Sequence, residues 1–320
     1  MTTHYLMKKE ALTISLATVF ALPDEAARAL FAKMRWGDGT EQTCPHCGSI
    51  REHYFRERQK RWRCRDCKEY FSVTSGTVFA NAKLRLQTLL GGIVLFANAV
   101  KGLSALQLMR DLDVQSKTAY VLLHKIRESL WIQQDLSKFK GTVEVDGGYV
   151  FTYCRPKNRK ADRLDGRLAE NQNPDKCAVL VIRERGEETQ QGAVRTRIVV
   201  LPSENANDVT AAVKANVEQD AIVVTDQGEG FTELGADFDH QVVNHSEEYS
   251  TPEGINENQA ESYIARFRRL HFGQIHKLSP KYLDVYAHEI AFREDTRRTS
   301  NGDIVERILR TCLRRGPSRD

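Results

Sequence analysis

Apolar residues recur at helical spacing in the first part of the chain. Between residues 1 and about 40, Ala26, Leu30 and Met34 fall on every fourth position, which predicts a helix that packs along this line. The pattern over 86–130 is again helical. The first third of the chain is therefore predicted to be mainly α-helical, outside its cysteine-rich part.

Past residue 140 the pattern becomes typical of strands. Strands are predicted over Thr142–Asp146, Cys177–Arg183, Arg195–Leu201 and Ala221–Thr225. A helix is predicted over Asn207–Val217, and the chain is helical again from Glu257. Strands that alternate with helices predict an α/β layer structure. The polar, basic segment Arg155–Gln172 is predicted to be a mobile loop.

Composition and charge narrow the class of protein. With 41% hydrophobic and 28% charged residues, the 320-residue chain is expected to form about two domains, or one large core with small appendages. It has no run of 18 apolar residues, so no membrane partner is expected. The net charge is only +4, but residues 51–68 hold eight Lys/Arg against three Asp/Glu, and Arg266, Arg268 and Arg269 cluster further on. Basic clusters beside candidate functional motifs favour an anionic partner.

Four of the seven cysteines form two C-x-x-C pairs, Cys44 with Cys47 and Cys64 with Cys67. Each pair turns two thiolates toward one point, and two pairs complete a tetrahedral sulfur site for zinc. Since four protein ligands leave no open position, the zinc is expected to be structural. The other three cysteines are isolated, and an odd count without a disulfide framework is typical of the reducing cytoplasm.

Basic and aromatic residues are interleaved between the two cysteine pairs. Zinc ribbons bind DNA, RNA or protein, so the metal site alone does not identify the partner. Here Tyr54, Phe55 and Trp62 alternate with basic side chains, which favours nucleic acid, because basic groups contact phosphates and aromatic rings stack. The predicted phosphate contacts are Arg56, Arg58, Lys60, Arg61 and Arg63.

Two predicted helices in the 86–130 region are joined by a short turn. Asp111–Val114 interrupts the pattern, and Ser116 is expected to cap the second helix. Apolar positions of the second helix are Ala119, Leu122, Leu123, Ile126 and Leu130. The spacing fits a helix-turn-helix that reads DNA, with Lys117 and Lys125 as contacts, and it also fits a plain helical hairpin.

Two aspartates stand at the ends of predicted strands. Asp146 closes Val143–Asp146 and Asp226 closes Val223–Asp226, and glycines follow both. A carboxylate at such a position can lie at a cleft without an unpaired charge being buried. Adjacent strands would bring the two together as oxygen ligands for Mg²⁺ or Mn²⁺. Taken singly, each aspartate is also typical of a residue that caps a turn.

An ordered series of segments extends over nearly the whole chain. It comprises the ribbon with its tail Phe71–Phe79, then Ser116–Arg127, Val143–Asp146, Thr225–Asp226, Val243–Tyr249, Asn258–Ser262, Gly273–His276 and Tyr286–Arg293. In this series the chain resembles the bacterial insertion-sequence transposases of the IS fifteen-ninety-five (ISXO-two-like) group. A zinc ribbon alone is common, whereas the ordered series is specific.

The resemblance implies an α/β, RNase H-like (retroviral integrase-type) catalytic core in which Asp146 and Asp226 are the first two of three metal-binding residues. Asn258 matches the third position, where this group often has Asn and many related transposases have Glu. A neutral amide oxygen can ligate a hard cation and leave it more electrophilic. Glu261 lies one helical turn further on the same face and is the alternative ligand.

Other positions that match the family leave their roles open. Arg268 stands ten residues after the asparagine, where the family usually carries Lys; arginine would hold a DNA phosphate but with another geometry. His245 and His276 match family positions, although a lone histidine is more often structural. Asn244 and Asn256 are alternatives for the third ligand.

The implied function is a DNA transposase that binds insertion-sequence ends and carries out metal-dependent cleavage and strand transfer. The implied cofactors are structural Zn²⁺ and catalytic Mg²⁺ or Mn²⁺, and the partners are terminal inverted repeats and target DNA. Lys157, Arg159 and Arg266 are expected to hold the DNA backbone, which makes binding sensitive to salt. Two ends must be held at once, so a dimer or larger assembly is expected, located in the cytoplasm and on the nucleoid.

The same interpretation divides the chain into five parts. They are an N-terminal helical segment (1–40), the zinc ribbon (41–80), a helix-turn-helix-like region (81–138), the RNase H-like core (139–300) and a C-terminal helical tail (301–320). The main alternative is a non-catalytic DNA-binding regulator derived from a transposase. A zinc-ribbon protein of transcription or RNA processing has no need of the acidic pair, and motifs of common small-molecule enzymes are absent from the sequence.

Overall fold

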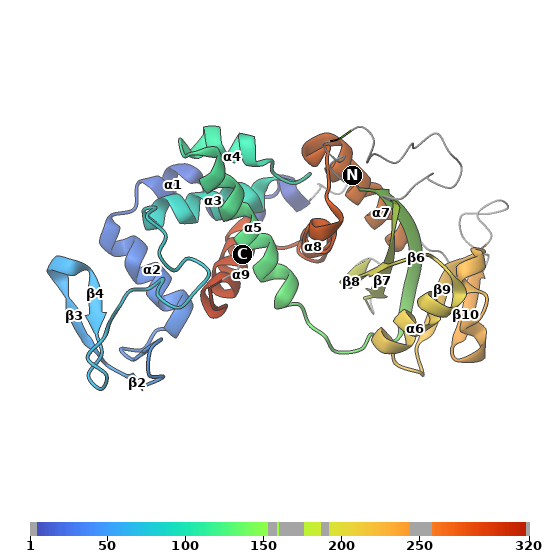
Figure 1. Cartoon of the computed structure of the whole chain (residues 1–320), viewed down its shortest axis with the longest axis horizontal. Helices are drawn as coiled ribbons and strands as arrows, with labels where there is room; N and C mark the ends of the chain where they lie inside the picture. The colour runs from blue at the N-terminus through green and yellow to red at the C-terminus, as the bar shows by residue number, and fades with distance from the viewer. Residues whose placement is uncertain (1–4, 153–158, 160–175, 187–191, 244–257, 318–320) are drawn as a thin grey trace. The chain divides into compact units, whose positions relative to one another are not determined.

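The computed structural model describes residues 5–152, 159, 176–186, 192–243 and 258–317. The chain folds into two compact units (Figure 1). The N-terminal unit comprises residues 1–133 together with 298–320, and the second unit comprises 134–297. The second unit is therefore inserted between two helices of the first. No helix in the described ranges is both long and apolar enough to cross a membrane.

Helices dominate the N-terminal unit. They are α1 (Leu16–Phe20), α2 (Asp24–Trp36), α3 (Leu86–Asn98), α4 (Ala105–Leu112), α5 (Ser116–Ile132) and α9 (Asn301–Arg314). The buried side of α2 consists of Ala27, Phe31 and Met34. The predicted packing line was thus partly wrong, since Ala26 is exposed and Leu30 only half-buried. The reason is that Phe31, which the every-fourth-residue pattern omitted, is the largest fully buried side chain of that helix.

The central helix of this unit is α3, which packs closely because of two adjacent glycines. A Cβ atom at Gly92 would lie 2.8 Å from Leu122 of α5, and one at Gly91 would lie 3.0 Å from Phe20 of α1. The last helix, α9, closes the unit through Asn301, whose side chain donates to the carbonyl of Ile14 at 2.8 Å and to Asn98 Oδ1 at 3.0 Å. Segments far apart in sequence therefore share one core.

Helices α4 and α5 form the expected helical pair. Ser104 caps α4 by accepting a hydrogen bond from the Gln107 amide at 3.1 Å. Ser116 is already the first residue of α5, and Gln115, at the N-cap, makes no side-chain cap. The predicted cap at Ser116 was therefore displaced by one residue. Buried Arg127 of α5 donates to the Leu103 carbonyl at 3.0 Å and fixes the approach to α4.

The cysteine-rich part consists of short antiparallel strands. A two-stranded sheet contains β1 (Gln42–Thr43) and β2 (Ile50–Arg51), and a three-stranded sheet contains β3 (Tyr54–Arg56), β4 (Arg61–Arg63) and β5 (Tyr70–Phe71). Trp62 points to the core side, where its ring meets that of Trp36 of α2 edge-on at 5.1 Å. The small ribbon is thus packed on the helices by aromatic contacts.

The second unit is built on a five-stranded mixed sheet. Its strands are β6 (Thr142–Phe151), β7 (Lys176–Arg185), β8 (Ala193–Leu201), β9 (Ile222–Asp226) and β10 (Asp239–Val243), in the spatial order β10-β9-β6-β7-β8. Strand β7 is antiparallel to both β6 and β8, whereas β9 and β10 run parallel to β6. This order and direction give the RNase H-like α/β fold that was expected. Strand β10 was not predicted, because its polar first half lies at the sheet edge and lacks an apolar alternation.

Helices cover both faces of this sheet. They are α6 (Ala206–Asn216), α7 (Asn258–Leu270) and α8 (Leu283–Asp295). Val143 and Val145 of β6 share a buried cluster with Val209 and Val213 of α6. The residues between them point the other way, toward α7, because side chains alternate along a strand. Short 3₁₀ turns lie at Tyr5–Met7, Lys9–Ala11, Glu57–Gln59, Glu229–Phe231, Leu234–Ala236 and Pro280–Tyr282, and a π turn at His271–Ile275 continues α7.

Candidate functional site

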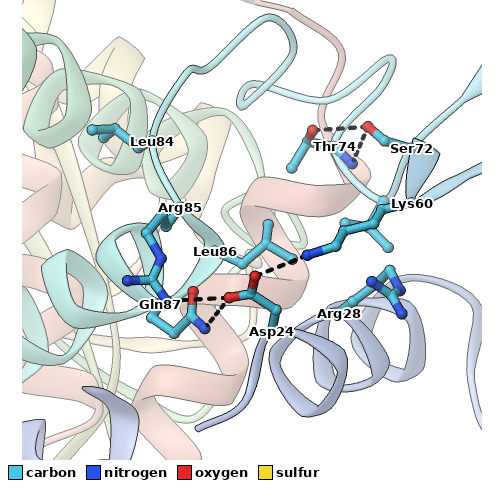
Figure 2. Close-up of a pocket in the computed structure, with 10 residues that line it drawn as sticks. Asp24, Arg28, Lys60, Ser72, Thr74, Leu84, Arg85, Leu86 and Gln87 are labelled. Carbon is cyan, nitrogen blue, oxygen red and sulfur yellow. Dashed lines mark hydrogen bonds and ion pairs between the residues drawn. The ribbon is translucent and has the colours of Figure 1, made fainter. Parts of the chain in front are cut away.

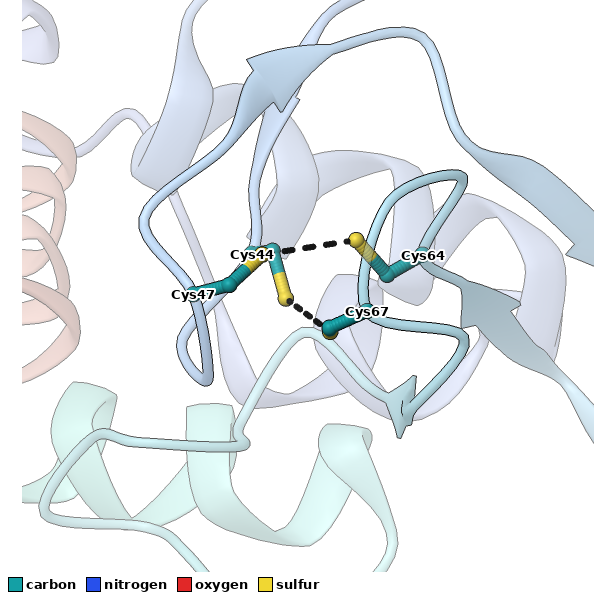
Figure 3. A group of neighbouring side chains, drawn as sticks. All are labelled: Cys44, Cys47, Cys64 and Cys67. Carbon is teal, nitrogen blue, oxygen red and sulfur yellow. Dashed lines mark hydrogen bonds between the residues drawn. The ribbon is translucent and has the colours of Figure 1, made fainter.

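The four cysteines of the ribbon converge on one point (Figure 3). The sulfur atoms of Cys44 and Cys67 are 3.7 Å apart, those of Cys47 and Cys64 are 3.6 Å apart, and all four lie within 4.8 Å of one another. Sulfur atoms that bind Zn²⁺ tetrahedrally at about 2.3 Å are about 3.8 Å from each other. The observed separations fit a closed, four-thiolate zinc site.

Each cysteine pair lies on a tight turn of the same design. The residue after each second cysteine, Gly48 or Lys68, has a positive φ, of 75° and 67° respectively. The amide of Asp66 lies 3.4 Å from the Cys64 sulfur. Burial is the largest influence on this thiol and raises its pKa, but the backbone N–H groups of Asp66 and Cys67 outweigh it and lower the pKa of Cys64 to about 7. The thiolate is therefore favoured at Cys64 and not at Cys67: there the backbone of Glu69 lowers the pKa of the thiol, but burial and the neighbouring cysteines together raise it to about 12.

One carboxylate ties the ribbon to the helices (Figure 2). Asp24, the first residue of α2, accepts hydrogen bonds from Gln87 at 2.8 Å, Lys60 at 2.9 Å and Arg85 at 3.2 Å. These bonds hold the pKa of Asp24 well below its usual range. Asp24 and its three partners line a pocket of about 230 Å³, which Arg28 also borders. Lys60, predicted as a DNA contact, is thus paired with Asp24 in this structure.

The outer face of the ribbon carries a group of arginine side chains. Arg56 and Arg61 stand directly opposite each other on β3 and β4, and both are exposed, as is Arg58. Like charges across a strand pair are destabilising unless an anion lies between them or beside them. Arg63 lies on the same face, its guanidinium 5.9 Å from the Tyr70 ring centre. These four arginines are called the ribbon basic face below.

A second basic surface lies at the beginning of α5. A pocket of about 360 Å³ is bordered by Lys83, Lys117 and Lys125, with Leu84 and Leu89 among its apolar walls. No carboxylate is among the described residues that line it. Partial burial lowers the pKa of Lys125. This α5 pocket combines the two lysines predicted from sequence with Lys83, which carried no signal because it lies in an irregular loop.

The two predicted aspartates lie on adjacent strands of the second unit's sheet. Asp226 ends β9 as predicted, but the prediction that Asp146 closes its strand was wrong, because the glycines after it stay paired with β7 and β6 continues to Phe151. Strands β6 and β9 are parallel, with Glu144 paired with Val224. Asp146 and Asp226 each follow two residues later, so the register carries both to the same edge and the same face. Asp226 is held in place by the amide of Gly228, which donates to its Oδ1 at 2.9 Å. The structure thus brings these two predicted ligands together.

Electrostatics confirm that Asp146 lies among other acids. Burial, followed by the negative charges of Asp226, Glu204 and Glu261, raises the pKa of Asp146 to about 7. Such a shift means that its carboxylate is poorly compensated by the protein alone. Oxygen ligands crowded together in this way fit a hard divalent cation, which would offset their repulsion.

Glu204 was not predicted from the sequence. It precedes α6 and lies against Gly147, where a Cβ atom would collide with its carboxylate. On the other side of the strand, a Cβ at Gly148 would lie 2.9 Å from Ile264 of α7. The two glycines after Asp146 therefore allow close approach on both faces of β6. The Asp-Gly-Gly sequence was a usable signal for such crowding, but it did not identify the partners.

Helix α7 presents the remaining candidates. Asn258 is its first residue and is exposed, and Glu261 is exposed in its first turn. Arg268 is exposed near the other end. Arg266 pairs instead with the buried Glu294 at 2.9 Å, so its guanidinium is engaged within the unit. The placement agrees with a site made by the start of α7, and the individual roles stay predictions.

Several predicted residues lie outside the described part of the chain. They are Lys157, Asn244, His245 and Asn256, and most of the predicted loop Arg155–Gln172. Arg159 is described and exposed. His276 follows the π turn with a positive φ of 56°, and its amide donates to the His271 carbonyl at 2.7 Å.

Comparison with known proteins assigns both units. Residues 138–295 match the family model of the ISXO2-like transposase domain, and residues 22–70 match that of the transposase zinc-ribbon domain. An uncharacterized protein in transposable element ISH50 of Halobacterium salinarum is 25% identical over 304 residues, which cover 91% of this chain and 97% of that protein. A crystal structure of the Mos1 mariner paired end complex with Mn is similar at 12% identity and a TM-score of 0.27, covering 69% of this chain and 75% of that one.

Removing one thiol from the ribbon should release its metal. We expect Cys64→Ser to reduce bound zinc from about one ion per chain to almost none, because three ligands with one hydroxyl no longer complete the site. Elemental analysis measures the zinc, and near-ultraviolet circular dichroism reports the Trp36–Trp62 contact. Cys177→Ser, in β7, is the control and should keep both signals; equal zinc in the two variants would contradict the assignment.

Neutralising Asp146 should stabilise the protein when no Mg²⁺ or Mn²⁺ is added. The pKa of Asp146 is about 7 in the folded protein, against an ordinary value of 3.8. The folded state therefore favours the protonated acid: this contribution to stability is complete below pH 3.8 and is lost as the pH rises through 7. Asp146→Asn is therefore expected to raise the free energy of unfolding by roughly 2–4 kcal/mol at pH 8 and very little near pH 4. Urea unfolding at both pH values measures this. The exposed Asp220→Asn serves as control, and a gain independent of pH would refute the electrostatic explanation.

Proposed function

The chain belongs to the ISXO2-like transposases, and from this premise we propose that it cuts the ends of its own DNA element and joins them to target DNA. The observation that carries the proposal is the register of β6 and β9, which sets two carboxylates beside each other under the first turn of α7. A regulator that only bound DNA would have no need of several acids that repel one another there.

We propose that Asp146, Asp226 and Asn258 hold Mg²⁺ or Mn²⁺, with Glu261 as the alternative third ligand. A bound divalent ion would lower the charge repulsion at the scissile phosphate and help to form the attacking oxygen. The protein's own contribution is to fix these oxygens on a rigid strand pair and a helix start. Arg268, exposed on the same helix, is available to hold a phosphate of the DNA strand.

The chemistry consists of two exchanges at phosphorus. In the first, the oxygen of water bonds to phosphorus at the element's end and the P–O3′ bond breaks; the proton of water goes to solvent and the leaving oxygen becomes a 3′-hydroxyl. In the second, that 3′-hydroxyl attacks a target phosphodiester and displaces a 3′-hydroxyl there. The first step is a hydrolysis, and in the second step one phosphodiester is made as one is broken, so no energy-supplying cofactor is required.

We propose that the N-terminal unit recognises the DNA ends. The ribbon basic face and the α5 pocket both offer lysine or arginine side chains suited to phosphates. Tyr120 and Val121 are exposed at the beginning of α5, where a recognition helix contacts bases. Zn²⁺ in the four-cysteine site would hold the basic face in shape. Because two ends take part, we propose a dimer or larger assembly on DNA.

The catalytic proposal is tested with labelled DNA carrying the element's end, in Mg²⁺ or Mn²⁺. We expect nicking and joining by the wild type, and a loss on the order of 10³-fold in Asp146→Asn and Asp226→Asn, because several kcal/mol of transition-state stabilisation disappear. Comparison of Asn258→Ala with Glu261→Gln identifies the third ligand by the larger loss. Asp220→Asn is the control for a distant charge change.

The contrary outcomes of that experiment have distinct meanings. DNA binding without any nicking or joining in either metal would favour the regulator derived from a transposase. Cleavage that survives Asp146→Asn would place the chemistry elsewhere in the chain.

Binding of the DNA ends should depend on both basic surfaces. Arg61→Ala and Lys117→Ala are each expected to weaken binding and to lower the slope of log affinity against log salt by about one, since each removes one phosphate contact. Fluorescence anisotropy over a range of salt concentrations measures the slope. Lys101→Ala, exposed in the loop between α3 and α4, is the control; slopes equal to that of the wild type would show that these residues do not touch the backbone.

A further inference from the structure

A carboxylate with no assigned role lies two residues before Asp146. Glu144 is the third residue of β6 and has no exposed surface. It lies on the same face of the sheet as Asp146, since two residues separate them on a strand. A buried carboxylate is tolerated only where hydrogen bonds and an opposite charge compensate it. Its partners therefore show what it is for.

The two oxygens of Glu144 have different partners. Oε1 accepts from Arg185 Nε at 2.6 Å, on the adjacent strand β7. Oε2 accepts from the backbone amides of Gln259 at 2.8 Å and Ala260 at 3.1 Å, in the first turn of α7. The first amides of a helix have no partner within the helix, and their partial positive charge favours an anion. Glu144 thus caps α7 from the sheet, a task usually given to a local side chain.

Other contacts make this attachment rigid. Buried Arg183 donates to the Gln259 carbonyl at 2.6 Å, so both sides of that peptide are held. Further along, Ile264 rests on Gly148 in the space that a Cβ atom would occupy. Helix α7 is therefore fixed to β6 at residues 144 and 148. Asp146 lies midway between these two points.

We propose that Glu144 is a positioning residue that holds the first turn of α7, and with it Asn258 and Glu261, against Asp146 for metal binding. This inference rests on the proposed function of the site and deepens it. The ion pair with Arg185 uses only one of the two carboxylate oxygens of Glu144. The other oxygen is committed to α7, and through the helix it reaches the residues that face the metal.

Glutamine at this position is the informative replacement. Its size matches that of glutamate, but its single carbonyl oxygen cannot accept from Arg185 and from the α7 amides at once. One of the two groups would then face an NH₂ donor. The matched control is Glu184→Gln, on the neighbouring strand: this carboxylate pairs with Arg195 at 2.8 Å and accepts from the amide of Lys140 at 3.4 Å.

Two measurements on the full chain, with its zinc retained, test the role without relying on DNA cleavage. Titration with Mn²⁺ followed by electron paramagnetic resonance is expected to show a Kd at least about 10-fold higher for Glu144→Gln than for wild type, as for other residues that orient metal ligands. Hydrogen exchange at the Gln259 and Ala260 amides is expected to be faster by about 10-fold or more, since a charged acceptor is lost. Glu184→Gln should change neither.

The outcomes separate this inference from the function on which it rests. If the wild-type protein binds no Mn²⁺, or if Asp146→Asn binds Mn²⁺ as well as the wild type does, the proposed metal site itself is wrong. If it does bind, and Glu144→Gln binds equally well, Glu144 has only a structural role. The double variant Glu144→Met/Arg185→Met guards against poor folding, because apolar replacement of a buried ion pair often preserves stability; it should fold and still bind Mn²⁺ more weakly.

Discussion

Repulsion among carboxylates that the fold forces together is the constraint around which the second unit is organised. The parallel pairing of β6 with β9 sets Asp146 beside Asp226, and Glu204 and Glu261 approach from the two faces. Unrelieved, this arrangement opposes folding, so the surrounding structure must hold these carboxylates in place. Two buried ion pairs and the hydrophobic cluster under α6 supply that rigidity.

The same sheet treats its acids in two ways, according to their partners. Glu144 is fully buried yet satisfied, because Arg185 and two helix amides share its charge. Asp146, two residues further along, is only half-buried. Burial and the charges of Asp226, Glu204 and Glu261 raise its pKa, and only the hydrogen bond from the amide of Gly147 acts in the other direction. One carboxylate has become part of the framework and the other is left available for a ligand.

Much of this was readable from the sequence because the signals were local. The two C-x-x-C pairs, the strand end at Asp226 and the helical periods around 86–130 depend on neighbours within a few residues. The glycines after Asp146 wrongly indicated a strand end there, since β6 continues through them. Contacts between distant segments left no such trace: Glu204 and Glu144 looked like ordinary polar positions, and the edge strand Asp239–Val243 showed no alternation. The packing side of α2 was misjudged because spacing does not tell which line meets the core. The resemblance supplied the RNase H-like fold that periodicity alone left as an unspecified α/β layer structure.

The closure of the N-terminal unit by α9 has a consequence for synthesis. Residues 1–133 emerge from the ribosome first, but their core is complete only when residues 301–314 have been made. The 164 residues of the second unit (134–297) come between, which at about 5–20 residues per second delays closure by roughly 10–30 s. During this interval the nascent N-terminal helices lack their final packing partner. The unit proposed to recognise DNA is thus completed only after the acidic unit has been synthesised.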